Sequence, residues 1–195
     1  MDPSDSEALN RLPHLDACLT ETLRLWPGLL TGGPRKTGKN GVWIAGRFIP
    51  PETTIVAPQY VISRRKCQPR PQFHVRHAYR ILDVLNRRVP PTGEEYFVRA
   101  REFIPERWTS SPELVLNAGA SAPFGTGTTN CLGRVLATNV IKCTAARLIR
   151  KYTFTLAPGD DARGVGSEVR DTLMPRPGNL SLCFKLRGKE AASAV

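Results

Sequence analysis

The strongest constraint on the fold of this 195-residue chain is the stretch FGTGTTNCLGR, Phe124 to Arg134, which holds one cysteine in a glycine- and threonine-rich loop. Gly125, Gly127 and Gly133 permit positive φ angles and close backbone approach, which suits a loop that wraps a flat ligand. Cys131 stands where the next helix is predicted to begin, and free N–H groups and the helix dipole there favour a thiolate, a soft ligand for iron. A buried structural cysteine beside a flexible loop is the alternative that spacing alone leaves open.

The remaining cysteines and the charge narrow the classes of protein to which the chain can belong. The five cysteines are odd in number and show no CxxC pairs, which favours reduced thiols and argues against a zinc ribbon. The sequence has no run of about 18 apolar residues, so we expect no membrane span. The acidic, polar start MDPSDSEALN argues against a secretory signal. The net charge of +11 suits a nucleic-acid partner, but outside residues 66–93 the basic residues form no stripe.

Hydrophobic periodicity predicts a mixed α/β chain that is mainly helical. Residues 12–27, LPHLDACLTETLRLWP, follow a helical pattern in which Leu15, Leu19 and Leu23 make one buried stripe. A second helix is predicted over residues 134–152, directly after the cysteine loop. Alternation and flanking turn residues predict short strands over residues 42–49, 53–57, 152–157 and 179–186. Asp160-Asp161 is interpreted as a solvated turn between the last two strands.

A carboxylate and a guanidinium on the first predicted helix form a second group of interest. Glu21 and Arg24 stand three residues apart on one helix face, with leucine and tryptophan side chains around them. As an exposed pair they would contribute only about 0.2–0.5 kcal/mol. A buried pair needs a further partner for its remaining lone pairs and protons, and Arg107, in the stretch PERW, can supply one.

With EXXR at 21–24, PERW at 105–108 and FXXGXXXCXG at 124–133 in this order, the chain resembles the C-terminal part of a cytochrome P-450, a haem-thiolate monooxygenase. FGTGTTNCLG matches every defining position of the haem-binding loop of that family, whereas EXXR and PERW are less specific. GGPR and GRFIPPETTIVAP resemble the fungal enzymes that oxidise secondary metabolites. The resemblance implies an EXXR helix, a small β-sheet, a meander, the cysteine loop, a following helix and terminal strands.

The resemblance also implies roles for residues of the loop. Cys131 would be the axial ligand of the iron in haem b (iron protoporphyrin IX), where a thiolate donates electron density that favours O–O cleavage. Phe124 would pack near that sulfur and shield it. Gly127 and Gly133 would let the loop approach the ring.

Residues outside the core of the loop receive supporting roles from the same resemblance. Arg35, in GGPR, stands where relatives often have an arginine that meets a haem propionate, and an exposed basic residue is an equally good interpretation. Thr129 replaces the arginine or histidine that usually faces a propionate, so it offers a hydrogen bond without a positive charge. Glu21, Arg24 and Arg107 would form the buried triad of the family, which holds the region under the haem and does no chemistry.

The chain has under half the length of a whole domain of this family, so we expect residues 1–195 to form a partial cytochrome P-450 domain. Its helices would normally bury apolar faces against helices that this chain lacks, which predicts exposed side chains at Leu15, Leu19, Ile141 and Leu148. The parent family lies at the endoplasmic reticulum membrane and faces the cytosol. This chain shows no anchor, and we expect it in the cytosol.

Residues 66–93 depart from the family pattern, with six basic residues, one acidic residue and four prolines but no periodicity. We interpret them as an irregular insertion, either a retained intron or a genuine surface loop. Codons available to residues 65–67 and 92–93 can contain a splice donor and a splice acceptor, and cutting there restores the family spacing in frame. Because long structureless loops are uncommon, the intron is the favoured interpretation.

The function implied by the resemblance is O2-dependent oxidation of a small organic molecule, with electrons from a flavoprotein cytochrome reductase. Substrate contacts are expected near a strand at Thr31–Pro34 and near a tip at Leu173–Pro177. No catalytic residue is assigned within this chain, and without the distal wall of the pocket we expect no turnover by the chain alone. The alternatives are a non-catalytic haem-binding remnant or pseudogene product and, resting on residues 66–93, a basic nucleic-acid-binding module; we expect no nucleic-acid partner.

Overall fold

The computed structural model describes residues 6–44, 46–64, 96–172 and 174–187, so the predicted insertion at 66–93 lies outside the described residues. The α-helices are α1 (Ser6–Leu9), α2 (Pro13–Leu25), α3 (Gln59–Ile62), α5 (Arg134–Lys151) and α6 (Arg163–Ser167). Short 3-10 helices are η2 (Pro105–Trp108), η3 (Pro112–Leu114), η4 (Ala118–Ala120) and η5 (Gly127–Thr129). The strands are β1 (Arg35–Lys36), β2 (Val42–Ile44), β3 (Arg47–Ile49), β4 (Thr54–Ile55), β5 (Tyr152–Leu156), β6 (Arg170–Thr172), β7 (Met174–Arg176) and β8 (Leu182–Leu186). They form the antiparallel pairs β1–β4, β2–β3, β5–β8 and β6–β7.

α2 forms where the sequence predicts the first long helix. Pro13 opens it, and Asp16 lies in its first turn, near the positive end of the helix dipole. Leu19 is buried, while Leu15 and Leu23 are half-buried. The expectation that Leu19 would be exposed is therefore wrong: its side chain is buried within the described chain.

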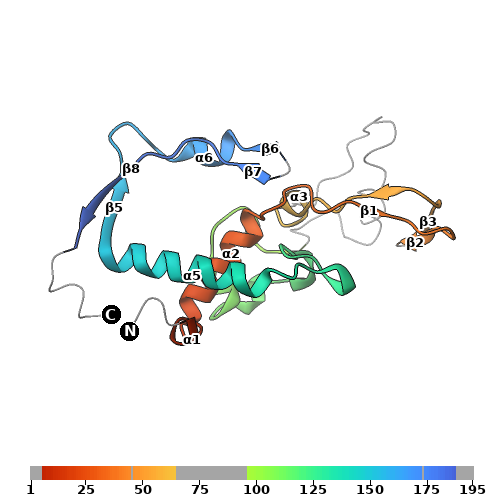
Figure 1. The fold of residues 1–195 in the computed structure, drawn as a ribbon, viewed down its shortest axis with the longest axis horizontal. Coiled ribbons are helices and arrows are strands. Elements are labelled where there is room, and N and C mark those ends of the chain that lie inside the picture. Colours follow the sequence, from red (N-terminus) through yellow and green to blue (C-terminus); the bar gives the residue numbers. More distant parts are fainter. Residues whose placement is uncertain (1–5, 45, 65–95, 173, 188–195) are drawn as a thin grey trace.

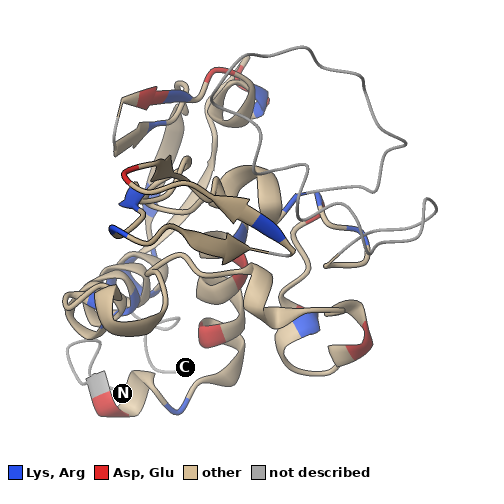
Figure 2. Cartoon of the chain, turned by 90° about the vertical axis from the view of Figure 1, so that its right-hand side faces the viewer, with Lys and Arg blue, Asp and Glu red and all other residues tan. Residues whose placement is uncertain are grey.

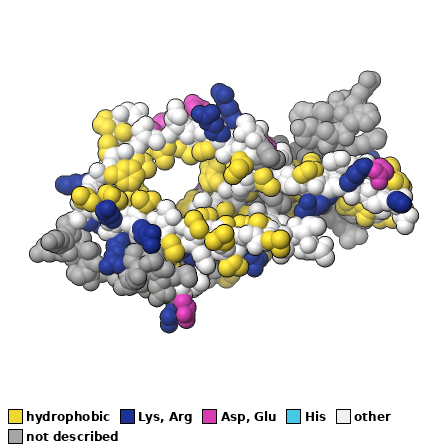
Figure 3. All heavy atoms as spheres, in the orientation of Figure 1, with side chains coloured by type: hydrophobic (Ala, Val, Ile, Leu, Met, Phe, Trp, Pro, Cys, Tyr) yellow, Lys and Arg dark blue, Asp and Glu magenta, His cyan; other side chains and the backbone are white. Residues whose placement is uncertain are grey.

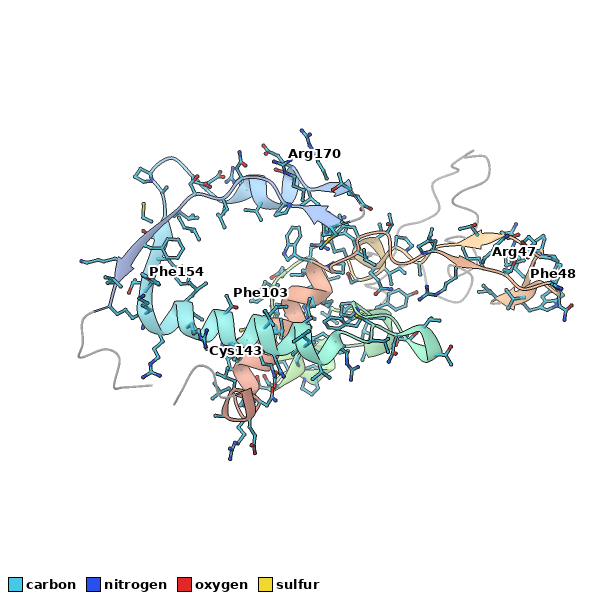
Figure 4. The ribbon with its side chains drawn as sticks, viewed as in Figure 1. Arg47, Phe48, Phe103, Cys143, Phe154 and Arg170 are labelled. Atoms are coloured by element: carbon cyan, nitrogen blue, oxygen red, sulfur yellow. The ribbon has the colours of Figure 1, made fainter. Side chains whose placement is uncertain are left out.

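The sheets of the N-terminal half are smaller than predicted. The β2–β3 hairpin pairs Trp43 with Phe48, whose ring centroids lie 5.5 Å apart, and its tip points away from the rest of the chain (Figures 1 and 4). Residues 31–34 are not a strand, in contrast to the prediction, and β1 begins only after Pro34. Gly32 has a φ of +75°, and a Cβ there would lie 2.4 Å from the carbonyl oxygen of Ala57, so this close crossing requires glycine.

α5 and the strands that follow confirm the second half of the secondary-structure prediction. α5 begins after Gly133 and leads directly into β5, which pairs with β8 from Tyr152 opposite Leu186 to Leu156 opposite Leu182. Near its middle, α5 buries Lys142, whose Nζ donates to Asn10 Oδ1 at 2.6 Å. Lys142 also forms an ion pair with the carboxylate of Asp16. These contacts fix α5 to the N-terminal helices.

The Asp160-Asp161 stretch lies in the loop directly after β5, where the sequence predicts a turn. Asp160 Oδ1 accepts the backbone N–H of Ala162 at 2.8 Å, and Oδ2 accepts that of Ser181 at 2.7 Å. These backbone hydrogen bonds hold the pKa of Asp160 below its ordinary value. The carboxylate therefore joins the turn after β5 to the residue before β8.

α5, the β5–β8 pair and the segment of α6, β6 and β7 are arranged around an opening (Figure 1). In the space-filling view, hydrophobic side chains border this opening, and Phe154 of β5 lies at its edge (Figures 3 and 4). Ile141 and Leu148 of α5 are each 40% exposed, as expected for a partial domain. Lysine and arginine residues are spread over several elements of the described chain (Figure 2). Among the described helices, none combines the length and the apolar composition that a membrane span requires.

Candidate cofactor site

The cysteine loop closes on itself through its backbone. The N–H of Cys131 donates to the carbonyl oxygen of Phe124 at 2.8 Å, and the N–H of Asn130 donates to that of Gly127 at 3.2 Å. Gly125 and Gly127 have φ angles of +72° and +74°, the left-handed region in which glycine carries no steric cost. The positive φ predicted at these two glycines is therefore present. A Cβ at Gly127 would meet no atom within 4 Å, so the face of the loop is open there.

Gly133 differs from the other two glycines. It caps α5 with a φ of −81°, which any residue can adopt, so no positive φ is needed at this position. A Cβ built on Gly133 would lie 3.8 Å from Cys131 Sγ, at ordinary van der Waals distance. Gly133 therefore leaves space on one side of the sulfur, and this is the part of the prediction that the geometry supports.

The thiol of Cys131 is exposed, which rules out the buried structural cysteine as an interpretation. It stands two residues before the N-cap of α5. Beyond it, Leu132 is 100% exposed, Val135 67% and Leu136 70%. Because these residues stand at i, i+3 and i+4 in and just before α5, they form one apolar stripe that starts beside the thiol. We call Leu132, Val135 and Leu136 the apolar stripe. An exposed apolar patch next to a soft metal ligand is typical of a ligand-binding surface.

The two residues predicted to face propionates lie side by side. Arg35 Nη2 donates to the backbone oxygen of Thr129 at 3.3 Å, although the two residues are 94 positions apart. Arg35 is exposed and lies on β1, so β1 brings a positive charge to the position where Thr129 itself has none. The contact uses the backbone carbonyl of Thr129 and not its hydroxyl group.

Glu21, Arg24 and Arg107 come together in a buried ion cluster. Their exposed fractions are 0%, 1% and 1%. Arg24 donates from Nε to Glu21 Oε2 and from Nη2 to Oε1, both at 2.8 Å, which is a bidentate pair. Arg107 donates from Nε to Oε1 at 2.9 Å. The structure thus supplies the third partner that a buried pair requires.

Two further donors to Glu21 were not found by sequence reasoning. Trp108 Nε1 donates to Oε2 at 3.0 Å, and the backbone N–H of Ile104 donates to Oε1 at 3.0 Å. Burial alone would raise the pKa of Glu21, but the hydrogen bonds from Arg24, Ile104 and Trp108 and the charge of Arg24 hold that pKa below its ordinary value. Trp108 directly follows Arg107 in the PERW stretch, and this adjacency is the only hint of the contact that the sequence contains.

Backbone carbonyl groups satisfy the outer edges of the cluster. Arg24 Nη1 donates to the carbonyl oxygens of Ser63 and Ala100, both at 2.7 Å. Arg107 Nη1 donates to those of Val98 at 3.0 Å and Leu114 at 3.1 Å. The cluster therefore fixes α2, the end of α3 and the segment before η2 to one another. Each charged group in the cluster therefore has hydrogen-bond partners within the fold.

The other thiols in the described chain have different surroundings. Cys18 and Cys143 are half-buried, and Cys183 is exposed on β8. Burial, together with the charge of Glu106, raises the pKa of Cys18. Within the described ranges, no three His, Cys, Asp or Glu side chains gather as a metal site would require. A site with one protein thiolate, such as Cys131 could provide, suits a metal whose other ligands come from a macrocycle, as in a haem-thiolate site.

Solved structures identify the fold to which these elements belong. A cyanobacterial CYP120A1 with bound retinoic acid is similar with a TM-score of 0.65 and 25% identity, over 93% of this chain and 34% of that chain. The haem domain of cytochrome P450DA gives a TM-score of 0.65 at 18% identity, over 95% of this chain and 33% of that one. The class is therefore the haem-thiolate fold, and the chain forms the C-terminal portion that the sequence predicts.

Sequence comparisons agree with this class. A model of the family described as Cytochrome P450 matches residues 2–76 and 92–184. The monooxygenase phqL of Penicillium fellutanum is 35% identical over 187 residues, covering 96% of this chain and 28% of the relative. The monooxygenase orf5 of Eupenicillium brefeldianum is 34% identical over 186 residues, covering 94% of this chain and 32% of the relative. The chain belongs to the cytochrome P450 family, and it spans about a third or less of the length of these relatives.

Proposed function

We propose that this chain supplies the cysteine-bearing side of a haem-thiolate monooxygenase, with Cys131 as the axial ligand of haem b. The observation that carries the proposal is the exposed thiol, held in a glycine loop at the start of the apolar stripe. The family implies haem as the cofactor, and the residues in this chain fit that group. When bound, haem would supply the oxygen and electron chemistry.

Each part of the site matches one property of a porphyrin. The apolar stripe offers a hydrophobic surface for the edge or face of an apolar ring. Contact with such a ring would remove the side chains of Leu132, Val135 and Leu136 from water. Arg35 offers a positive charge for a propionate, and Thr129 offers a hydroxyl beside it. Phe124 would shield the sulfur, while Gly127 and Gly133 keep the approach open.

The buried ion cluster supports this site without taking part in proton transfer. The Glu21 carboxylate has a lowered pKa and accepts five hydrogen bonds. It therefore carries no proton to donate, and its lone pairs are already used by protein donors and not left for a substrate. Its proposed role is to hold α2 and η2 together beneath the cofactor.

For the whole protein we propose O2-dependent oxidation of a small organic molecule, with electrons from a flavoprotein reductase. The matched relatives are fungal cytochrome P450 monooxygenases, which supports a role in fungal secondary metabolism. Substrate contact is proposed near residues 31–34 and near β7, where Met174 is 74% exposed; Leu173 lies outside the described residues. A chain that oxidised a substrate unaided, with only haem and a reductase, would contradict our expectation of no turnover by this part alone.

Residues 66–93 are proposed to be an insertion, with a retained intron favoured over a surface loop. The match to the family model leaves out residues 77–91, which lie inside this segment, and that gap supports the proposal. The genomic codons for residues 65–67 decide between the two forms, because a retained intron requires the GTAAGT donor there.

Thiol protection tests the assignment of the ligand. Iodoacetamide is added to the chain with and without prior addition of hemin, and alkylated peptides are counted by mass spectrometry. Hemin should protect Cys131 from alkylation and leave Cys183, the exposed thiol on β8, as reactive as before. Equal alkylation of Cys131 with and without hemin would contradict the proposal.

A further inference from the structure

Helix α3 connects the buried ion cluster to the cysteine loop, and the connection begins at Ser63. Arg24 Nη1 donates to the carbonyl oxygen of Ser63 at 2.7 Å, and Ser63 Oγ lies 2.7 Å from the carbonyl oxygen of Arg24. Ser63 is 1% exposed, so this reciprocal contact is shielded from water. It fixes the last turn of α3 to the end of α2, beside which α3 lies in the ribbon view (Figure 1).

The connection then runs from Ser63 to Gln59, the first residue of α3. Ser63 Oγ lies 2.7 Å from the carbonyl oxygen of Gln59, and the N–H of Ser63 donates to the same oxygen at 3.0 Å. The backbone of Gln59 is thus held by a residue that the ion cluster itself holds. The backbone N–H of Tyr60, next in the chain, donates to the carbonyl oxygen of Leu30 at 3.1 Å, which adds a second anchor.

The side chain of Gln59 reaches the other way, to the start of the cysteine loop. Its Oε1 accepts the backbone N–H of Ala122 at 2.8 Å, in a partly buried contact between residues 63 positions apart. The carbonyl oxygen of Ala122 in turn accepts the N–H of Gly125 at 2.9 Å, and the carbonyl oxygen of Phe124 accepts the N–H of Cys131. Five hydrogen-bonded steps therefore connect the ion cluster to Cys131.

A second anchor on the far side of the loop is weaker. Arg35 holds the far side of the loop through Thr129 at 3.3 Å, and Arg35 is exposed. Pro123, directly after Ala122, has no N–H to donate, so the Ala122 N–H carries the attachment at this end of the loop.

We propose that Gln59 is a positioning residue: it fixes the start of the cysteine loop to the buried ion cluster and thereby sets where the Cys131 sulfur stands for its metal. The inference deepens the proposed function, and one part of its test does not depend on haem. Gln59 touches neither metal nor substrate. It acts through the backbone of Ala122, and any residue with an acceptor oxygen at the same reach would replace it.

Two substitutions separate the acceptor from the bulk of the side chain. Gln59→Met retains the length and removes the acceptor, whereas Gln59→Glu retains an acceptor oxygen. Asn117→Ala is the matched control, because Asn117 Oδ1 accepts the N–H of Gly119 at 3.0 Å in the segment before the loop, a local hydrogen bond that does not involve α3. The full chain carries each substitution.

The first measurement is hydrogen exchange at single amides, without hemin. Gln59→Met should speed exchange at Ala122 by about tenfold or more and also speed exchange at Cys131, while Gln59→Glu restores protection and Asn117→Ala changes only Gly119. Unchanged exchange at Ala122 in Gln59→Met would overturn the proposal. If amides of α2 also lose protection in Gln59→Met, that variant is partly unfolded and Gln59→Glu becomes the deciding variant. Wild-type protection of the Ala122 amide in Gln59→Glu supports the proposal. Loss of that protection in Gln59→Glu, while α2 stays protected, overturns it.

The second measurement adds hemin and reads the carbon monoxide spectrum of the reduced sample. Substitution of a merely structural residue lowers the total amount of bound haem. Substitution of a positioning residue also lowers the fraction of the bound haem that is ligated by the thiolate. Gln59→Met should lower this fraction at least twofold, and Gln59→Glu should restore it. An unchanged fraction would overturn the positioning role. A wild-type chain that binds no haem would refute the proposed function instead, and hydrogen exchange would then decide the role of Gln59 in the loop.

Discussion

Replacing Glu21 with glutamine should destabilise the chain by about 3–5 kcal/mol, because it removes the charge that balances two buried guanidinium groups. Glu21 is fully buried and accepts two hydrogen bonds from Arg24, one from Arg107, one from Trp108 and one from the backbone of Ile104. A glutamine at position 21 retains one acceptor oxygen, but its NH2 group replaces the other oxygen and faces N–H groups that can only donate. Since domains are stable by about 5–15 kcal/mol, this loss is a large fraction of the total.

Urea unfolding followed by circular dichroism, with linear extrapolation to water, measures this loss. The matched control is Glu7→Gln, because Glu7 of α1 forms an exposed pair at 3.9 Å with Arg11, in the turn after α1, and the loss of this pair should cost less than about 1 kcal/mol. Acid adds a second signature. The lowered pKa of Glu21 means that its contribution is complete above the ordinary carboxyl pKa and is lost as the pH falls through the lowered value, so Glu21→Gln should flatten that acid-side decline. A loss no larger than that of the control would refute the account of the cluster.

Three smaller effects follow from the same structure. Trp108→Phe removes one donor to an ionised carboxylate that keeps its other donors, so urea unfolding should show a loss of about 1.5–3 kcal/mol, below that of Glu21→Gln, and an equal loss would contradict this ranking. Because the pKa of Asp160 is lowered, the turn it closes should loosen as the pH falls through that lowered value, seen as faster exchange at the Ser181 amide, and Asp160→Asn should remove this pH dependence. In a time course of alkylation near neutral pH, Cys131 should react before Cys18, whose thiol is half-buried and has a raised pKa; the reverse order would count against the exposed loop.

The local patterns of the sequence predicted the long elements well, for physical reasons that specific residues show. Pro13 and Asp16 mark the start of α2, and the cysteine loop marks the start of α5, so cap signals and periodicity agree at both helices. β1 was missed because two residues that pair only with β4 leave no alternating pattern. Leu19 was expected at the surface because nothing in the pattern of its own helix reveals which segments of the fold bury it.

The candidate site was predictable only as far as its motifs extend. Cys131 and its glycines are contiguous, so one loop sequence reveals them, and the i, i+3, i+4 spacing of the apolar stripe is visible in the sequence although its exposure is not. The contacts of Gln59 with Ala122 and of Trp108 with Glu21 join residues 63 and 87 positions apart. Neither residue belongs to a periodic pattern, because the tertiary fold alone decides which acceptor or donor it meets.

The measurement closest to the central claim compares carbon monoxide spectra of reduced, hemin-loaded wild type, Cys131→Ser and Cys183→Ser. Wild type and Cys183→Ser should both show the red-shifted Soret band of sulfur ligation, and Cys131→Ser should lack it, because the serine oxygen cannot replace a soft thiolate. The same spectrum in all three proteins, or loss of the band in Cys183→Ser alone, would contradict Cys131 as the ligand.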